Sequence, residues 1–254
     1  MKEKVIDFLC SHRSIREFAP KAVEANILEK LYEVVCCTAS SLGMQQSSVI
    51  RVTDPEKKAA IAEIATQEYI ARAPELWIYC ADTHRNTEIL KQKDALTNVG
   101  FDADHFFQGV TDAALTAQNV NVAVEALEMG GVFIGSILNH TKKIVELLEL
   151  PEGVFPVLGY IFGYPGQNPQ KKPRMPKEYR IFENQYGLSE NIVSDLAPYD
   201  AIMNTYYDLR DANRRVDTFT DQVVTKYAKS NPIRCELLTV AKEQGFQLEA
   251  SDKD

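Results

Sequence analysis

Apolar positions in the first quarter of the chain recur at helical spacing. They predict one helix that covers the Asp7 region up to Cys10 and a second that begins near Glu24. Residues 54–56, Asp-Pro-Glu, supply an N-cap, a proline at the first helical position and an acidic side chain in the first turn, so a third helix is predicted to about Ala65. The apolar face of the second helix consists of Ile27, Leu28, Leu31, Val34 and Val35.

Three segments have the length and composition of β-strands. Residues 76–81 form a continuous apolar run, which is typical of a central strand, and residues 154–164 predict another buried strand. The β-branched residues 47–53 predict a shorter one. The polar residues 82–104 are too many for a simple connection, so we expect them to form a helix or an excursion.

The strongest helical signal lies over residues 110–129. Apolar side chains occur on nearly every face of this segment, which is typical of a helix buried in the core or in an interface. Gly130 and Gly131 are predicted to end the helix as its C-cap. Apolar residues 132–135 follow directly, and a short helix is predicted over residues 141–148.

Beyond Pro176 the pattern is that of amphipathic helices. They are predicted at residues 196–214, 221–229 and 233–244, with Gly245 as a helix stop. Strands and helices alternate irregularly along the whole chain. The pattern therefore predicts an α+β fold rather than a doubly wound parallel sheet.

The composition is that of an ordinary soluble globular protein. Of the 254 residues, 45% are hydrophobic and 25% are charged, which suits one large domain or two small ones. No run reaches the roughly 18 apolar residues of a membrane span, and the N-terminus lacks the apolar core of a signal peptide, so we expect a cytoplasmic protein. The net charge of −8 disfavours a nucleic-acid partner.

Several kinds of site are not indicated. The five cysteines form no CxxC pair and are expected to be small buried hydrophobic residues. The histidines lack metal-ligand spacing, so no metal site is predicted. Motifs of P-loop, zinc-peptidase and serine-hydrolase sites are absent from the sequence.

Positive charge gathers at two places against this acidic background. Residues 12–16, His-Arg-Ser-Ile-Arg, offer arginine forks and a hydroxyl that suit a phosphate, or else form a solvated basic turn. Residues 171–174, Lys-Lys-Pro-Arg, are extended by the proline, which sends Lys172 and Arg174 to the same side. This segment either binds a phosphate or is a solubilising loop.

The glycine-rich residues 130–135 are a third candidate, because glycine permits close approach of the backbone to a flat ligand. Taken together and in this order, these three segments resemble the flavin-dependent nitroreductase family. The similarity is to the branch that contains NfsA-type NADPH nitroreductases and NADPH–FMN oxidoreductases. Residues 47–54, 77–82 and 183–186 match it as well.

The resemblance implies an α+β fold with a central, mostly antiparallel sheet flanked by helices. It implies a homodimer with FMN bound at the subunit interface. Residues 1–176 would form the FMN-binding core, and residues 177–254 would form a helical extension that embraces the partner and adds to the NADPH site, all within one structural unit. The implied activity is ping-pong transfer of hydride from NADPH, or NADH, to FMN, followed by two-electron reduction of nitroaromatics, quinones or flavins.

The resemblance also assigns roles to residues of this chain. At the phosphate and ribityl end of FMN it places His12, Arg13, Ser14, Lys172 and Arg174. Near the flavin ring it places Arg16, Gln67, Phe133, Ile134, Gly135 and Ser136, with Ser40 contributed by the second subunit. For the 2′-phosphate of NADPH it suggests Arg210, Arg214 and Arg215, although Asn231 stands where the family has an arginine before Pro232.

No side chain is predicted to act as a catalytic acid or base, because the cofactor does the chemistry. Two alternatives stay open. The protein could be an FMN-binding carrier or redox sensor with little turnover, or a helical interaction module without flavin. The sequence does not identify the physiological electron acceptor.

Overall fold

The computed structural model describes residues 2–97, 99–206 and 217–249, and the chain divides into two compact units. The larger unit comprises Ser14–Asn168 and Pro232–Asp254. The smaller unit comprises Met1–Arg13 and Pro169–Asn231. Among the described residues, no helix combines the length and the apolar character needed to cross a membrane.

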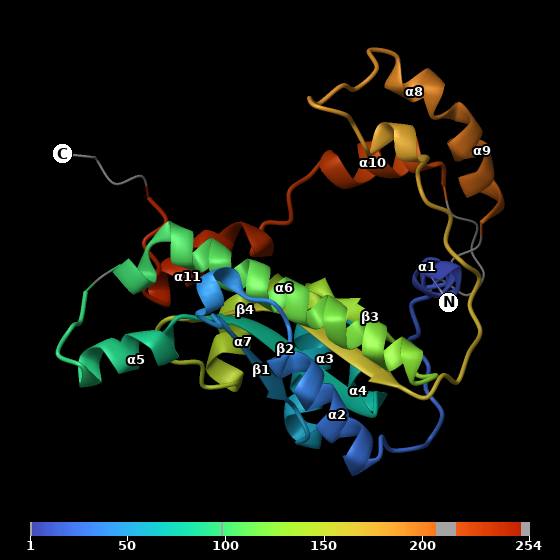
Figure 1. The fold of residues 1–254 in the computed structure, drawn as a ribbon. Helices are drawn as coiled ribbons and strands as arrows, with labels where there is room; N and C mark the ends of the chain where they lie inside the picture. The colour runs from blue at the N-terminus through green and yellow to red at the C-terminus, as the bar shows by residue number, and fades with distance from the viewer. Residues whose placement is uncertain (1, 98, 207–216, 250–254) are drawn as a thin grey trace. The chain divides into compact units, whose positions relative to one another are not determined.

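A four-stranded antiparallel sheet is the centre of the larger unit (Figure 1). Its spatial order is β1-β2-β4-β3, so β2 and β4 are the inner strands, as the apolar runs predict. The strands are β1 (Ser47–Arg51), β2 (Glu75–Asp82), β3 (Gly130–Ile134) and β4 (Val154–Gly163). The antiparallel sheet with flanking helices confirms the predicted α+β class.

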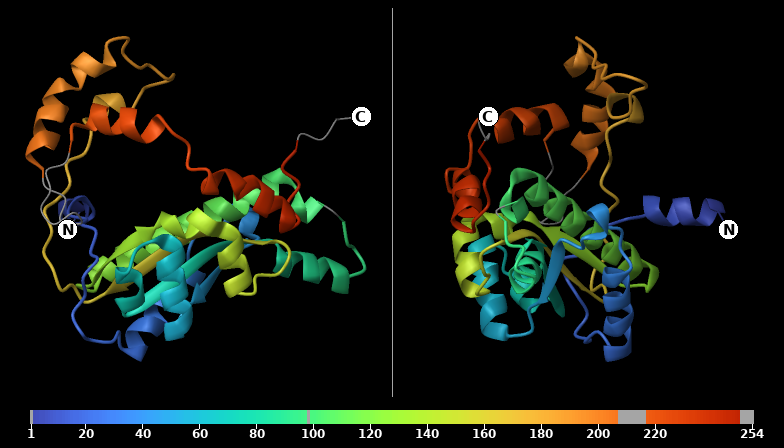
Figure 2. Two further views of the ribbon diagram at one scale, coloured as in Figure 1. Left: turned by 180° about the vertical axis from the view of Figure 1, so that it is seen from behind. Right: turned by 60° about the vertical axis from the view of Figure 1, so that its left-hand side comes forward.

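The two faces of the sheet carry different helices, because side chains alternate along each strand. From β2, Ile78 and Cys80 join a buried cluster with α3, α4 and α7, whereas Trp77 and Tyr79 join a second cluster with α2 and α6. Figures 1 and 2 show the sheet between these two helical layers. The helices are α2 (Ala25–Cys36), α3 (Pro55–Ala65), α4 (Tyr69–Arg72), α6 (Ala103–Ala126) and α7 (Thr141–Leu147).

The long helix α6 begins earlier and ends earlier than predicted. Asp102 caps it by accepting a hydrogen bond from the His105 N–H at 2.8 Å, a signal hidden in the polar stretch. The helix stops at Ala126, and the left-handed residue that follows is Glu128, with φ of 60°. The prediction that Gly130 and Gly131 form its C-cap is therefore wrong, because both glycines belong to β3.

Two further parts of the larger unit are the segment between β2 and α6 and the segment near the C-terminus. The polar stretch contains α5 (His84–Gln92) and the 3₁₀ turn η2 (Val99–Phe101). Near the C-terminus, η6 (Ile233–Glu236) leads into α11 (Leu237–Glu243), which Gly245 ends with φ of 90°, as predicted. This helix packs through Val240, and Phe246 after it lies against Phe106 with ring centroids 4.8 Å apart.

The smaller unit is helical, as predicted for the region beyond Pro176. Its apolar cluster is built around Leu196, Tyr199 and Met203, with Phe219 packed against them. Its helical segments are α1 (Lys2–Cys10), η4 (Lys177–Tyr179), α8 (Ile192–Asp195), α9 (Ala197–Thr205) and α10 (Phe219–Tyr227). The helix predicted over residues 196–214 corresponds to α9 at its start, and the remainder lies largely outside the described residues.

The cysteines do not follow the expectation of burial. Cys80 alone is buried, inside β2, and burial raises the pKa of its thiol to about 12. The other four are exposed, so the prediction of buried hydrophobic residues is wrong for them. All four lie in, or directly after, helical segments: Cys10, Cys36, Cys37 and Cys235.

Candidate functional site

The edge strand β3 and the turn after it carry the residues predicted to line a flat ring. Ile134 is buried in the sheet, and the half-buried Phe133 lies 4.9 Å from Tyr160, centroid to centroid. The chain leaves the sheet at Gly135 and enters the 3₁₀ turn η3 (Gly135–His140). Within the described part of the chain, the buried Ser136 Oγ has no hydrogen-bond partner.

The N-terminal basic segment is fastened to the beginning of the same strand. The Ile15 N–H donates to the Gly131 carbonyl at 2.9 Å. The next residue, Arg16, has a buried Nε atom with no partner among the described residues. Leaving a buried donor unpaired costs about 1–3 kcal/mol, so both Arg16 and Ser136 are suited to a ligand that supplies hydrogen-bonding groups.

Gln67 stands on the opposite face of the sheet from α6, in the turn between α3 and α4. Its amide oxygen accepts a hydrogen bond from the Tyr69 hydroxyl at 2.8 Å, which orients the side chain. The preceding Thr66 is left-handed, with φ of 55°, and ends α3. Gln67 is half-buried.

Ser40 lies in the loop between α2 and β1 and lines a pocket of about 310 Å³. Its hydroxyl accepts a hydrogen bond from the Gln45 N–H at 3.2 Å. The pocket is rich in hydroxyls and has two cationic side chains on its wall, Arg51 and Arg85. Arg51 is neutralised by a bidentate pair with Glu75, at 2.7 Å for each bond.

The second basic segment belongs to the smaller unit. Arg174 Nη1 donates to the Lys172 carbonyl at 2.8 Å, which folds the guanidinium back over the main chain. The Tyr199 hydroxyl, from α9, donates to the Pro173 carbonyl at 3.3 Å and so fixes the extended segment. Burial raises the pKa of Tyr199, and the nearby Arg174 charge opposes that rise.

His12 and Arg13 follow α1 in the same unit. The helix ends with the Ser11 N–H and hydroxyl both donating to the Phe8 carbonyl, at 3.0 and 2.7 Å. His12 is half-buried and Arg13 exposed. Arg210, Arg214 and Arg215 lie outside the described residues.

Two side chains near these positions were missed by sequence reasoning. Arg234 Nη2 donates to the Gly135 carbonyl at 3.3 Å, which brings a cation to the turn after β3. The resemblance implies an arginine before Pro232, where this chain has Asn231, and Arg234 lies two positions after that proline. Asp112, buried in α6, accepts hydrogen bonds from the loop that carries Ser40, and no feature of its sequence context indicates this role.

No group of three or more His, Cys, Asp or Glu side chains able to hold a metal ion occurs within the described ranges. The chemistry that these residues offer is therefore that of hydrogen bonding and positive charge. The larger unit provides unpaired buried donors beside β3, and the smaller unit provides cationic side chains at residues 12–13 and 172–174.

Comparison with known proteins shows similarity over almost the whole chain. A family model described as "Nitroreductase family" matches residues 9–164, and one described as "Nitroreductase family, C-terminal domain" matches residues 172–249. The chain is 38% identical over 243 residues to the oxygen-insensitive NADPH nitroreductase of Salmonella typhimurium, covering 95% of this chain and 97% of the relative.

Solved structures have the same fold. The structure of B. megaterium NfrA2 matches with a TM-score of 0.88 and 32% identity, covering 97% of this chain and 99% of that one. The NADPH:FMN oxidoreductase from Vibrio harveyi, solved in complex with NAD+, matches with a TM-score of 0.83 and 31% identity, covering 95% and 98%.

Proposed function

This chain belongs to the nitroreductase family, and we propose that it is an FMN-dependent NAD(P)H oxidoreductase. The electrons would pass in two-electron steps to nitroaromatic, quinone or flavin acceptors. The observation that carries the proposal is the near full-length similarity to relatives named NADPH nitroreductase and NADPH:FMN oxidoreductase.

The residues around β3 fit the ring of FMN. Arg16 Nε and Ser136 Oγ are buried polar atoms that have no protein partner among the described residues, and the edge of a flavin carries carbonyl and ring-nitrogen groups that would pair with them. Phe133, Ile134 and Gly135 would lie along the ring, and Gln67 would contact it. Ser40 would come from the second subunit.

The basic residues fit the other end of the cofactor. A phosphate monoester carries about −1.5 to −2 charges near neutral pH, and in an acidic protein it needs a local cluster of cations. His12, Arg13 and Ser14 would bind the phosphate and ribityl chain, together with Lys172 and Arg174. Tyr199 supports this assignment, because its hydroxyl fixes the segment between those last two cations.

When bound, FMN supplies the redox chemistry by taking a hydride from NAD(P)H and passing two electrons onward. The part of Arg16 is electrostatic: its positive charge would favour the electron-rich reduced ring. No side chain is assigned a proton-transfer step. We propose that the 2′-phosphate of NADPH is bound by Arg210, Arg214 and Arg215. NADH is included as a second donor, because Asn231 stands where the family has a further arginine.

A visible spectrum tests the function. The purified protein should show a flavin band, or gain one on addition of FMN, and anaerobic NADPH should bleach it. A band that NADPH and NADH both leave unchanged would favour an FMN carrier or redox sensor. Absence of any band after FMN is added would exclude both readings and leave the helical interaction module.

We further propose that the protein is a homodimer in which α6 lies at the subunit contact. The inner face of α6 is buried, yet Phe107 and Leu115 on its outer side are 65% and 47% exposed. Large apolar side chains that stay exposed on a mostly buried helix are suited to a partner surface.

Leu115→Arg is therefore expected to convert the dimer to a monomer at micromolar concentration, because it places a charge in an apolar contact. Sedimentation velocity measures the change. Ile89→Arg is the matched control, since Ile89 on α5 is 53% exposed and equally apolar. Equal dissociation of both variants, or of neither, would contradict the placement of α6.

A further inference from the structure

The loop of residues 40–46, which joins α2 to β1, has an unusual backbone. It contains the 3₁₀ turn η1 (Ser41–Gly43), and three of its residues are left-handed: Leu42 with φ of 52°, Gly43 with 72° and Gln45 with 53°. Non-glycine residues in this conformation cost of order 1 kcal/mol each and persist only when neighbours hold them. The loop must therefore be fixed by contacts from outside it.

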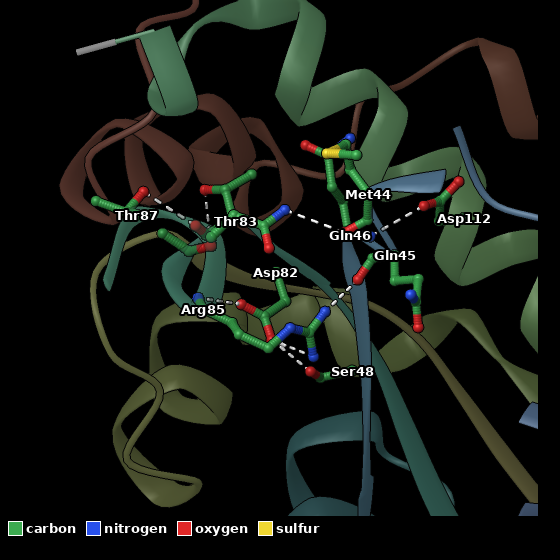
Figure 3. Close-up of polar contacts among 11 residues, drawn as sticks. Met44, Gln45, Gln46, Ser48, Asp82, Thr83, Arg85, Thr87 and Asp112 are labelled. Carbon is green, nitrogen blue, oxygen red and sulfur yellow. Dashed lines mark hydrogen bonds and ion pairs between the residues drawn. The ribbon is translucent and has the colours of Figure 1, made fainter. Parts of the chain in front are cut away.

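Asp112 is the main contact. It lies on α6, is 1% exposed, and uses both carboxylate oxygens on the loop. Its Oδ1 accepts from the Ser41 N–H at 2.8 Å. Its Oδ2 accepts from the Gln46 N–H at 3.0 Å, as Figure 3 shows. These two N–H groups stand at the two ends of the turn, so one side chain sets the distance between them.

The beginning of α5 braces the carbonyl groups of the same loop. Arg85 Nη2 donates to the Gln45 carbonyl, and Asn86 Nδ2 donates to the Met44 carbonyl at 3.1 Å. Arg85 is itself steadied by Asp82, 3.9 Å from its Nη1, and the Asp82 carboxylate also accepts from the Ser48 hydroxyl (Figure 3). Side chains from two helices thus hold the loop in one shape.

The carboxylate at position 112 indicates what this side chain does in the fold. A buried charge is costly, and a purely structural site could be filled by an apolar or amide side chain at equal or lower cost. Only a carboxylate presents two acceptor oxygens to two separate N–H groups, whereas asparagine turns a donor toward one of them. The residue type therefore matches the task of holding this turn precisely.

We propose that Asp112 is a positioning residue, which holds the 40–46 loop in the shape that presents the Ser40 hydroxyl to FMN bound in the second subunit. The inference rests on the proposed function, in which Ser40 makes that contact across the dimer. Ser40 Oγ accepts the Gln45 N–H within the loop, so its own O–H is available to donate outward. Asp112 acts through the loop and touches neither cofactor nor substrate.

The first test is the affinity for FMN, measured by fluorescence titration of the apoprotein. Asp112→Asn is expected to raise the Kd about tenfold, because one of the two loop N–H groups loses its acceptor. Glu146→Gln is the matched control: it makes the same change of group at an exposed position of α7, on the other face of the sheet from α6, and should leave the Kd unchanged. An unchanged Kd in Asp112→Asn would overturn the proposal.

A second variant serves in case Asp112→Asn does not fold. Arg85→Gln releases the Gln45 carbonyl at a side chain that is 47% exposed, so the core is not disturbed. It is expected to raise the Kd for FMN about threefold. An unchanged Kd for FMN in this variant would mean that contacts from outside the loop do not set its shape, which would contradict the proposal.

Mixed dimers separate positioning from a general structural effect. Asp112→Asn chains are combined with Arg16→Met chains, whose own ring contact is removed. If Asp112 acts across the dimer, one site pairs an intact Arg16 with an intact loop, and half of the sites recover the wild-type Kd. If Asp112 acts within its own subunit, or only on stability, both sites stay weakened and the proposal is overturned.

The same measurements distinguish this inference from the proposed function. If the wild-type chain binds no FMN, the proposed function fails and the inference fails with it. If the wild type and Glu146→Gln bind FMN with equal affinity and the mixed dimers show no recovered site, the inference alone fails.

Discussion

Gly131→Ala is expected to destabilise the protein by at least about 3 kcal/mol, among the larger effects of a single methyl group. A Cβ atom built at this position would lie 2.4 Å from the Ile161 carbonyl oxygen and 2.5 Å from both Cζ and the hydroxyl oxygen of Tyr160. The first of these is backbone of the neighbouring strand. Nothing in the sheet can move aside without breaking the pairing of β3 with β4.

Tyr160 cannot give way either. Its hydroxyl donates to Asn121 Oδ1 at 2.9 Å, its ring is stacked on Phe162 at 5.4 Å, and burial raises its pKa well above the ordinary value. For a chain of this length, 3 kcal/mol corresponds to a fall in Tm of about 6–12 °C. Thermal and denaturant unfolding of the two proteins measure it.

Gly135→Ala is the matched control in the same segment, because no atom lies within 4 Å of its added Cβ and its backbone suits alanine. It should change the free energy of unfolding by less than about 0.5 kcal/mol. Gly130→Ala falls between the two, since its Cβ meets only the Ile15 side chain, at 2.5 Å. Equal stability of the Gly131 and Gly135 variants would contradict the steric argument.

These glycines also show where sequence reasoning succeeds and where it stops. The apolar runs locate β2 and β4, and the Asp54-Pro55 signal locates the start of α3, because local patterns encode burial and capping directly. The sequence predicts a helix end at Gly130 and Gly131, because a glycine at a helix C-cap and a glycine at a close packing contact look alike in a sequence. The structure shows close packing, which depends on Ile161 and Tyr160 far along the chain.

The candidate site also contains some residues that the sequence predicts and others that it does not. The basic residues 12–16 and 171–174 stand out in an acidic chain, so charge alone is enough to nominate them. Charge clustering does not identify Asp112 and Arg234 as site residues. Each of them contacts a main-chain group more than 60 positions away in the sequence. Such contacts depend on how α6 and the C-terminal helices fold back on the sheet. Acidic and basic side chains are too common for either residue to be distinctive by itself.

Arg16→Met is expected to have effects of opposite sign on stability and on binding. In the absence of ligand, the substitution removes a buried Nε atom that has no partner among the described residues, so the free energy of unfolding should rise by about 1 kcal/mol. Methionine keeps the length of the side chain and packs flexibly. The Kd for FMN should rise about 100-fold, because a charged hydrogen bond to the ring is lost.

Thermal unfolding with and without FMN, together with a fluorescence titration, measures both effects on the same samples. Arg72→Met is the matched control: Arg72 makes an exposed pair with Glu17 at 3.0 Å, which contributes little, so neither stability nor affinity should change appreciably. If Arg16→Met lowers the stability of the free protein and leaves the Kd unchanged, Arg16 is a structural residue. A gain in stability together with a loss of FMN affinity is the decisive result. A side chain that only stabilises the fold would have its buried donor paired within the protein, whereas a side chain that binds a ligand pairs its donor with that ligand.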